Sequence, residues 1–276
     1  MRHCCAERRT VLGALGIRRN SYALSARSVK SPAALWSGCL KSRPLRRRLS
    51  FCGLLLTWVL WSPTGLFAAP PFKTTDTGTA ETGVLELRLG LIQFARQGSR
   101  NEVLSPLIRA NYGLGSNLEL VSEFEYDQSE NTTGNGALGL KWRFLDGDGF
   151  SMGIEMLTLL PVRSGDSGPG IESQLLMTWR RGGEHLQFNV GGFHDPRGAA
   201  TVDGWRASLL AERRLDGFRH GIEVFARQKR GLPTDARLGY GFVKSFGSFD
   251  VRSGVHWGLT RQAPDVVFNL WVSREF

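Results

Sequence analysis

Serine, histidine and aspartate, the residues of a hydrolase site, form no recognisable catalytic set in residues 69–276. Ser253 and His256 are three positions apart, so on a β-strand they would face opposite sides. His194-Asp195 and Ser208 offer no third catalytic partner at a recognisable spacing. We therefore predict that the chain is not an enzyme.

The residue types that bind metals do not form a ligand set either. All four cysteines lie at or before Cys52, and the rest of the chain has no thiol. The run from Asp146 to Gly149 (DGDG) lacks the later ligands of a calcium loop and is better read as a turn. We expect no metal and no cofactor.

Charged residues alternate with apolar ones along several extended segments, so their side chains could gather on one face of a sheet and form a common site. On strands, such residues share one face, which we assign to the lumen of a barrel as a pore-lining hypothesis. The acids of this face are Glu86, Glu119, Glu123, Glu125, Glu155, Glu172, Glu212, Glu223 and Asp250. The bases are Arg88, Arg109, Lys141, Arg143, Arg180, Arg206, Arg227, Arg237 and Arg252, and His256 lies on the same face. Nine acids against nine bases predict little net charge selectivity, and we expect a cross-strand pair between Glu123 and Lys141.

The segments that carry these residues have a period of two. Leu85, Leu87, Leu89 and Leu91 fall on one face, and the same alternation recurs to the end of the chain. We predict twelve strands, at 83–95, 103–112, 118–126, 137–145, 150–162, 171–180, 185–194, 204–213, 220–227, 236–245, 249–260 and 265–276. Most are as long as the tilted strand of a transmembrane barrel, and their connectors are alternately long and short. The sequence thus predicts an all-β protein, a transmembrane antiparallel up-and-down β-barrel spanning 83–276.

A soluble β-sandwich is the alternative, since alternation alone does not identify which face is wet. Aromatic residues near strand ends favour the barrel as interfacial girdles; they are Trp142, Phe144, Trp179, Phe193, Trp205, Phe246, Phe249 and Trp257. The last strand places Phe268, Leu270, Val272 and Phe276 on one face. We expect this pattern to be the signal that the barrel-assembly machinery reads.

The first part of the chain has a different character. Residues 1–68 contain twelve Lys or Arg and one acid, whereas residues 69–276 contain 23 bases and 24 acids. The net charge of +10 therefore does not belong to the folded part, and we expect no nucleic-acid partner. The apolar run in 49–61 is too short to span a bilayer and predicts a signal peptide over 44–68, with cleavage after Ala68. Residues 1–43 are expected to be a misassigned start or a disordered extension, and 69–82 a short periplasmic segment.

Three stretches resemble a known family. The ending runs Gly258-Leu259-Thr260, Ala263-Pro264-Asp265 and a final strand that closes on Phe276. Together with the runs at 112–120 (YGLGSNLEL) and 138–145 (LGLKWRFL), it resembles the outer-membrane barrels named for the MetA pathway of phenol degradation. This resemblance, over about 84–276, implies a solute transporter, and the family name suggests aromatic compounds.

We predict a bacterial outer-membrane barrel for passive transport of small polar or amphipathic solutes. Its partners would be outer-membrane lipids, the assembly machinery and a small-molecule solute. The external loops, Asp127–Gly136 and Asp195–Asp203 especially, would gate the channel or pre-select solutes. Two alternatives stay open: a non-transporting structural or lipid-interacting barrel with a salt-bridged, closed lumen, and an outer-membrane lipid-modifying enzyme.

Overall fold

The computed structural model describes residues 70–198 and 200–276, and its regular structure is β throughout. The strands are β1 Leu85–Gln97, β2 Arg100–Gly115, β3 Leu118–Asp127, β4 Thr132–Gly147, β5 Phe150–Leu159, β6 Gly170–Arg181, β7 Glu184–Asp195, β8 Val202–Leu215, β9 Phe218–Lys229, β10 Asp235–Phe246, β11 Phe249–Gly258 and β12 Val266–Glu275. Within the described ranges, no helix is both long and apolar enough to cross a membrane. The predictions for 1–43, for the signal peptide and for cleavage after Ala68 lie outside the described residues.

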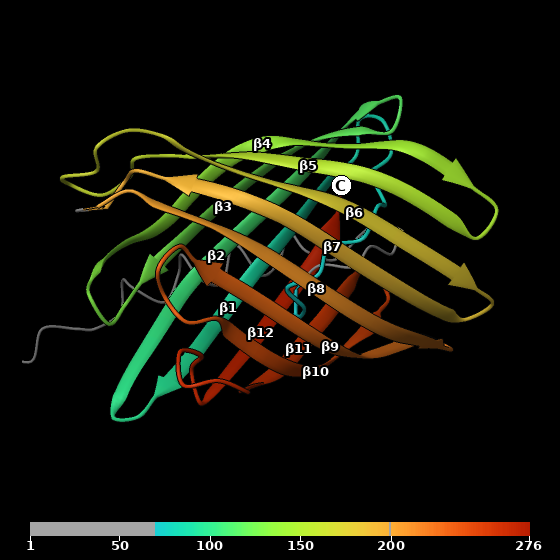
Figure 1. The fold of residues 1–276 in the computed structure, drawn as a ribbon. Coiled ribbons are helices and arrows are strands. Elements are labelled where there is room, and N and C mark those ends of the chain that lie inside the picture. The colour runs from blue at the N-terminus through green and yellow to red at the C-terminus, as the bar shows by residue number, and fades with distance from the viewer. Residues whose placement is uncertain (1–69, 199) are drawn as a thin grey trace, which may run out of the picture. The chain divides into compact units, whose positions relative to one another are not determined.

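The twelve strands form one closed antiparallel barrel, as the alternation predicted (Figure 1). Each strand pairs with the next along the chain, and β1 pairs with β12 to close the ring. At the closure, Leu85 and Phe276 exchange two backbone hydrogen bonds of 3.1 and 2.9 Å. Every strand therefore has a partner on both sides, and no sheet edge is left exposed.

The connectors give the barrel two different rims. The short-turn rim carries two-residue turns at 116–117, 148–149, 182–183, 216–217 and 247–248. The long-loop rim carries 98–99, 128–131, 160–169, 196–201, 230–234 and 259–265. At 116–117 both Ser116 and Asn117 have positive φ, the conformation of a hairpin turn that follows the strand twist.

Two loops are shorter than the sequence predicted. The expected loop at 96–102 is the two-residue turn 98–99, and β4 begins at Thr132, so most of the predicted gating loop Asp127–Gly136 is strand. Backbone pairing continues through these polar residues because the strands already aligned below them extend the same hydrogen-bond ladder, as in Gln97 opposite Arg100.

The two faces of the sheet divide apolar from charged residues. Leu87, Leu89, Leu138 and Leu140 point outward and are exposed, whereas the charged residues between them point inward. Six of the predicted girdle aromatics are also outward and exposed: Trp142, Phe144, Trp179, Trp205, Phe246 and Trp257. The prediction that Phe193 belongs to the outer aromatic girdle is wrong, since its ring is buried in the lumen.

Residues 70–82 do not lie outside the barrel as a periplasmic segment but inside it. Backbone groups of Thr74, Thr77 and Ala80 donate hydrogen bonds to inward-facing side chains of the wall. Thr82 forms a bridge with Gly113 near the short-turn rim, immediately before β1. The segment, which we call the inner segment, thus enters at the short-turn rim and runs up the lumen. Polar side chains on the wall attract it because its peptide groups need partners once they leave water.

Candidate functional site

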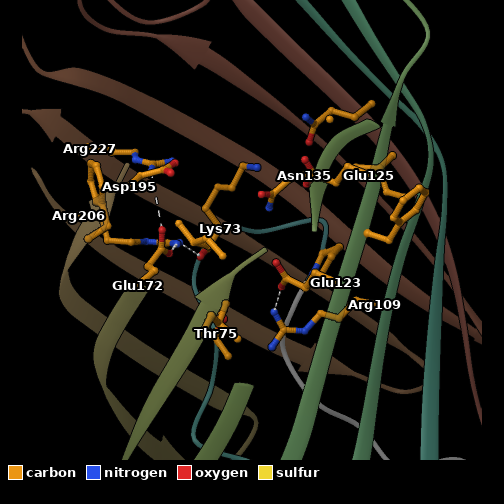
Figure 2. A pocket seen from close by; sticks show the side chains of 18 of the residues that line it. Lys73, Thr75, Arg109, Glu123, Glu125, Asn135, Glu172, Asp195, Arg206 and Arg227 are labelled. Carbon is orange, nitrogen blue, oxygen red and sulfur yellow. Dashed lines mark hydrogen bonds and ion pairs between the residues drawn. The ribbon is translucent and has the colours of Figure 1, made fainter. Parts of the chain in front are cut away.

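A cavity of about 570 Å³ lies inside the barrel towards the long-loop rim (Figure 2). Its rim-side lining includes Asn135, Asp195 and Lys229, which stand at the ends of strands beside long loops. Lys73 and Thr75 of the inner segment also line it. The cavity is therefore a vestibule between the loops and the inner segment.

One side of the vestibule is held by Arg109 on β2. Its guanidinium forms ion pairs with Glu123 on β3 and, at 2.6 Å, with Glu155 on β5. Gln174 donates a further hydrogen bond of 2.8 Å to Glu155. Since a buried carboxylate without a partner is costly, these contacts fix all three charged groups in place.

The other side is built by β6, β8 and β9. Glu172 pairs with Arg206 and, more distantly at 3.7 Å, with Arg227. The guanidinium of Arg227 lies 4.1 Å from the ring centroid of Phe193, which explains why this aromatic residue is stable inside the lumen. Figure 2 shows Glu172, Arg206 and Arg227 on one side of Lys73, with Arg109, Glu123 and Glu125 on the other.

Below the vestibule, the stretch of wall formed by β1, β12 and β11 carries further buried ion pairs. Glu86 pairs with Arg88 at 2.5 Å and with Arg252 at 3.3 Å, and Arg252 also reaches Asp250 at 3.4 Å. All four side chains are at most 4% exposed. The wall here is a charge network rather than an open polar channel.

The inner segment is bound most tightly at Glu223 on β9. Its carboxylate accepts hydrogen bonds from the Lys73 and Thr74 backbones, at 3.0 and 2.5 Å, and from Thr74 Oγ1 at 2.6 Å. His256 Nε2 lies 2.8 Å from the same carboxylate. One buried charged group therefore joins the inner segment to both β9 and β11.

Glycines in the wall leave room for the inner segment. A Cβ at Gly241 would lie 2.7 Å from Pro71, and one at Gly254 would lie equally close to it. At Gly113, a Cβ would lie 1.9 Å from the carbonyl oxygen of Glu81. Larger residues at these positions would displace the segment.

Lys73 is the cation between the two sides of the vestibule. Burial lowers the pKa of its ammonium group, and the positive charge of Arg237 lowers that pKa further. A lysine in this position loses its proton more readily than one in water. The vestibule therefore becomes more negative as pH rises.

Of the nineteen residues assigned to the lumen, eighteen lie on the inward side of the wall, and the nineteenth, Arg180, lies at the short-turn rim, where it donates a hydrogen bond of 2.8 Å to Ser151. They include Glu125, which lines the vestibule, and Arg237, whose guanidinium lies 5.8 Å from the ring centroid of Phe225. Arg143 lies at the short-turn rim, where it pairs with Asp146 at 3.3 Å. Twelve of the others are buried: Glu86, Arg88, Arg109, Glu119, Lys141, Glu155, Glu172, Glu212, Glu223, Asp250, Arg252 and His256. Glu123, Arg206 and Arg227 are partly buried and line the vestibule.

The predicted pair of Glu123 with Lys141 is wrong. The β3–β4 register places Glu119 opposite Lys141 and Glu123 opposite Ala137. Lys141 accordingly pairs with Glu119, at 3.2 Å. The reason is the short loop 128–131, which sets the register of the hairpin.

Several lumen residues escaped sequence reasoning. Lys73 stands in a segment without alternation, and no pattern there indicated a place in the lumen. Gln174, Gln187 and Asn189 are buried on the inward face, each in phase with the predicted charges. A search for all polar residues of that phase, not only charged ones, would have found these three.

The residues weighed for an enzyme do not come together. Ser208 is buried on β8, and its Oγ has no hydrogen-bond partner among the described residues. His256 is bound to Glu223, and His194 lies 2.6 Å from Asp203. In residues 70–198 and 200–276, no group of three His, Cys, Asp or Glu is arranged to hold a metal ion.

The last strand presents the residues predicted as an assembly signal on its outer side. Phe268 and Phe276 are exposed, and Leu270 and Val272 are partly so. Arg274, which interrupts this face in the sequence, lies 4.7 Å from the ring centroid of Phe276. The aromatic ring thus accommodates the charge beside it.

Comparisons with known proteins identify a fold and no family. No protein-family model and no curated protein sequence matches the chain. Among solved structures, the NanC porin matches with a TM-score of 0.55 at 10% identity, over 69% of this chain and 98% of that one. An anion-selective porin from Comamonas acidovorans matches with a TM-score of 0.39 at 11% identity, over 63% of this chain and 60% of that one. The likeness to the NanC porin shows that this chain has the twelve-stranded fold of a porin barrel.

Proposed function

We propose that this protein is an outer-membrane channel through which small polar or amphipathic solutes pass passively. The observation that carries the proposal is a charged vestibule inside a closed barrel whose outer face is apolar. An apolar outer face suits lipid, and a polar lumen suits solute. The long-loop rim would face the outside, because outer-membrane barrels carry their longer loops there.

The surface supports a place in the outer membrane. Trp142 and Phe144 form a ring pair of 5.6 Å near the short-turn rim, while Trp205 and Trp257 are exposed towards the other rim. Two aromatic bands are what the two interfaces of a bilayer favour. The exposed Phe276 at the end of β12 fits the proposed contact with the assembly machinery.

Aromatic compounds are the solutes that the family resemblance adds to the proposal. The rings of Phe72, Phe193 and Trp271 line the vestibule and would contact an aromatic solute. These rings are also compatible with any amphipathic solute, so they support the wider class as well.

The inner segment must move for solute to pass. It occupies the lumen between the vestibule and the short-turn rim, with partners at Glu223, Thr178 and Glu119. We therefore propose that the channel rests with the inner segment bound and conducts when it is displaced.

A closed structural barrel is the second candidate. The buried network of Glu86, Arg88 and Arg252 favours it, because ion pairs between β1 and β11 stiffen the wall and leave little room for water beside it. In this case the inner segment would be a permanent part of the core.

Liposome swelling separates the two candidates. We expect slow swelling with the chain from residue 69 onward and fast swelling with a variant lacking 70–80. If neither protein supports swelling or current in planar bilayers, the channel proposal is refuted and the structural barrel stands.

A further inference from the structure

We propose that the vestibule binds small zwitterions whose ammonium and carboxylate groups are several bonds apart, such as an ω-amino acid. The proposal rests on the proposed channel function and names its solute class. It comes from the way the barrel places opposite charges on opposite walls.

The topology sets two pairs of strands face to face. In a closed ring of twelve strands, those six positions apart stand across the lumen from each other, so β3 faces β9 and β2 faces β8. β3 contributes Glu123 and Glu125 to the vestibule, whereas β9 contributes Arg227 and Lys229. An anionic wall therefore faces a cationic wall.

The anionic wall keeps negative charge after its internal pairs are formed. Arg109 is the base that pairs with Glu123 and Glu155. Among the described residues, no ion pair or hydrogen bond engages the Glu125 carboxylate, and Glu102 beside it is exposed. Lys73 acts on the Glu125 carboxylate through its charge but forms no ion pair or hydrogen bond with it. An incoming ammonium group would therefore find in Glu125 an acceptor without a hydrogen bond.

The cationic wall likewise keeps positive charge. Glu172 is shared between Arg206 and Arg227, and its contact with Arg227 is long at 3.7 Å. The buried Nε of Arg227 has no hydrogen-bond partner among the described residues, and Lys229 forms no ion pair with them. A carboxylate would receive donors from both side chains.

The vestibule as a whole is neutral, which decides between classes of solute. Six bases line it, namely Lys73, Arg109, Arg197, Arg206, Arg227 and Lys229. Six acids line it as well, namely Glu102, Glu123, Glu125, Glu155, Glu172 and Asp195. A simple anion or cation gains at one wall and is repelled by the other, whereas a zwitterion gains at both. The volume of about 570 Å³ suits a small solute.

Binding can be measured by calorimetry on the full barrel in detergent micelles, with no transport needed. The probes are ε-aminocaproate and three analogues of similar length: caproate, hexylamine and the neutral caproamide. We expect ε-aminocaproate to bind about tenfold or more tightly than each analogue, since each analogue lacks at least one charge-assisted hydrogen bond. Equal affinities for the four probes, or tightest binding of caproate or hexylamine, would overturn the proposal.

Single variants assign each end of the solute. Glu125→Gln should weaken ε-aminocaproate and hexylamine by about tenfold and leave caproate unchanged. Lys229→Met should weaken ε-aminocaproate and caproate and leave hexylamine unchanged. Glu130→Gln is the matched control, because Glu130 pairs with Arg100 on an exposed loop outside the cavity. If either vestibule variant behaves like this control, the assignment of that wall is refuted.

A charge reversal gives the decisive comparison and guards against misfolding. Glu125→Lys and Lys229→Glu should each abolish the preference for ε-aminocaproate, and the double variant should restore it with the solute reversed. A loss that persists in a double variant that still migrates as a folded barrel would overturn the proposal. Binding without swelling would refute the channel and keep the site, whereas swelling without zwitterion preference would do the opposite.

Discussion

Glu223→Gln is the change that tests most directly whether the inner segment is held by one buried carboxylate. Glu223 accepts two backbone hydrogen bonds and one hydroxyl hydrogen bond from residues 73–74, and it is fully buried. A glutamine has nearly the same size but only one acceptor oxygen. Its amide group would point either at the Lys73 N–H and His256, which share one oxygen of the carboxylate, or at the N–H and hydroxyl of Thr74, which share the other. Facing either N–H, it would bring two donors together.

The magnitude follows from these contacts. Hydrogen bonds to a charged group contribute about 1.5–3 kcal/mol each, and one oxygen of the glutamine can still accept part of the set. A net loss of roughly 2–4 kcal/mol in the binding of the inner segment is therefore expected. This loss corresponds to a rise of roughly 30- to 1,000-fold in the fraction of barrels whose segment is displaced.

Displacement of the inner segment can be measured by thiol labelling, because the sequence has no cysteine after Cys52. A Thr79→Cys substitution puts a single thiol in the inner segment, at a side chain that is 8% exposed. Its rate of reaction with a maleimide then reports how often the segment leaves the lumen. Glu223→Gln should accelerate labelling and raise conductance together.

An unchanged labelling rate in Glu223→Gln would refute the reasoning, because it would mean that the carboxylate does not hold the segment. The exposed pair of Glu130 and Arg100 provides the control, since Glu130→Gln removes a carboxylate from an ion pair far from the segment. Labelling in this control should match that of the parent protein.

Three further predictions concern the wall. Gly113→Ala should lower the free energy of unfolding by about 1–3 kcal/mol, because the added Cβ would overlap the carbonyl oxygen of Glu81. Gel-shift melts would show this loss as a lower temperature of unfolding. Gly147→Ala is the control and should have little effect, since its Cβ would lie 3.5 Å from the nearest atom, the carbonyl oxygen of Phe150. Arg109→Met should cost about 3–5 kcal/mol by leaving two carboxylates without their base, whereas Arg100→Met at an exposed pair should cost less than about 1 kcal/mol. Because the pKa of Lys73 is lowered, this lysine should lose its positive charge at a lower pH than exposed lysines do. The preference of the channel for cations, measured from reversal potentials, should therefore increase as pH rises. Lys73→Met should remove this pH dependence.

The barrel was predictable because lipid and lumen impose a strict period of two. Leu138, Leu140 and Trp142 had to face outward once Lys141 faced inward, and the structure has them there. The same rule placed the charged residues of the lumen. Phe193 broke it, since its ring is stabilised by Arg227 from the neighbouring region of the wall, and such a contact is not local in sequence.

The pairs and the inner segment were not predictable from local pattern. Which acid meets Lys141 depends on the register of β3 against β4, and a loop of uncertain length left that register open. The inner segment has no period at all. Its place is set by partners such as Glu223, which is separated from Thr74 by 149 positions, so only the folded barrel brings them together.

The junction of the inner segment with β1 determines which end of the segment can leave the lumen first. Thr82 is fixed beside Gly113, so the segment is tethered at the short-turn rim. From this tether its contacts with the wall follow in order, first at Glu119, then at Ser151 and Thr178, and last at Glu223. The contact at Glu223 is therefore the one farthest from the tether. With the tether in place, release that starts at Glu223 frees the part of the segment beside the vestibule first.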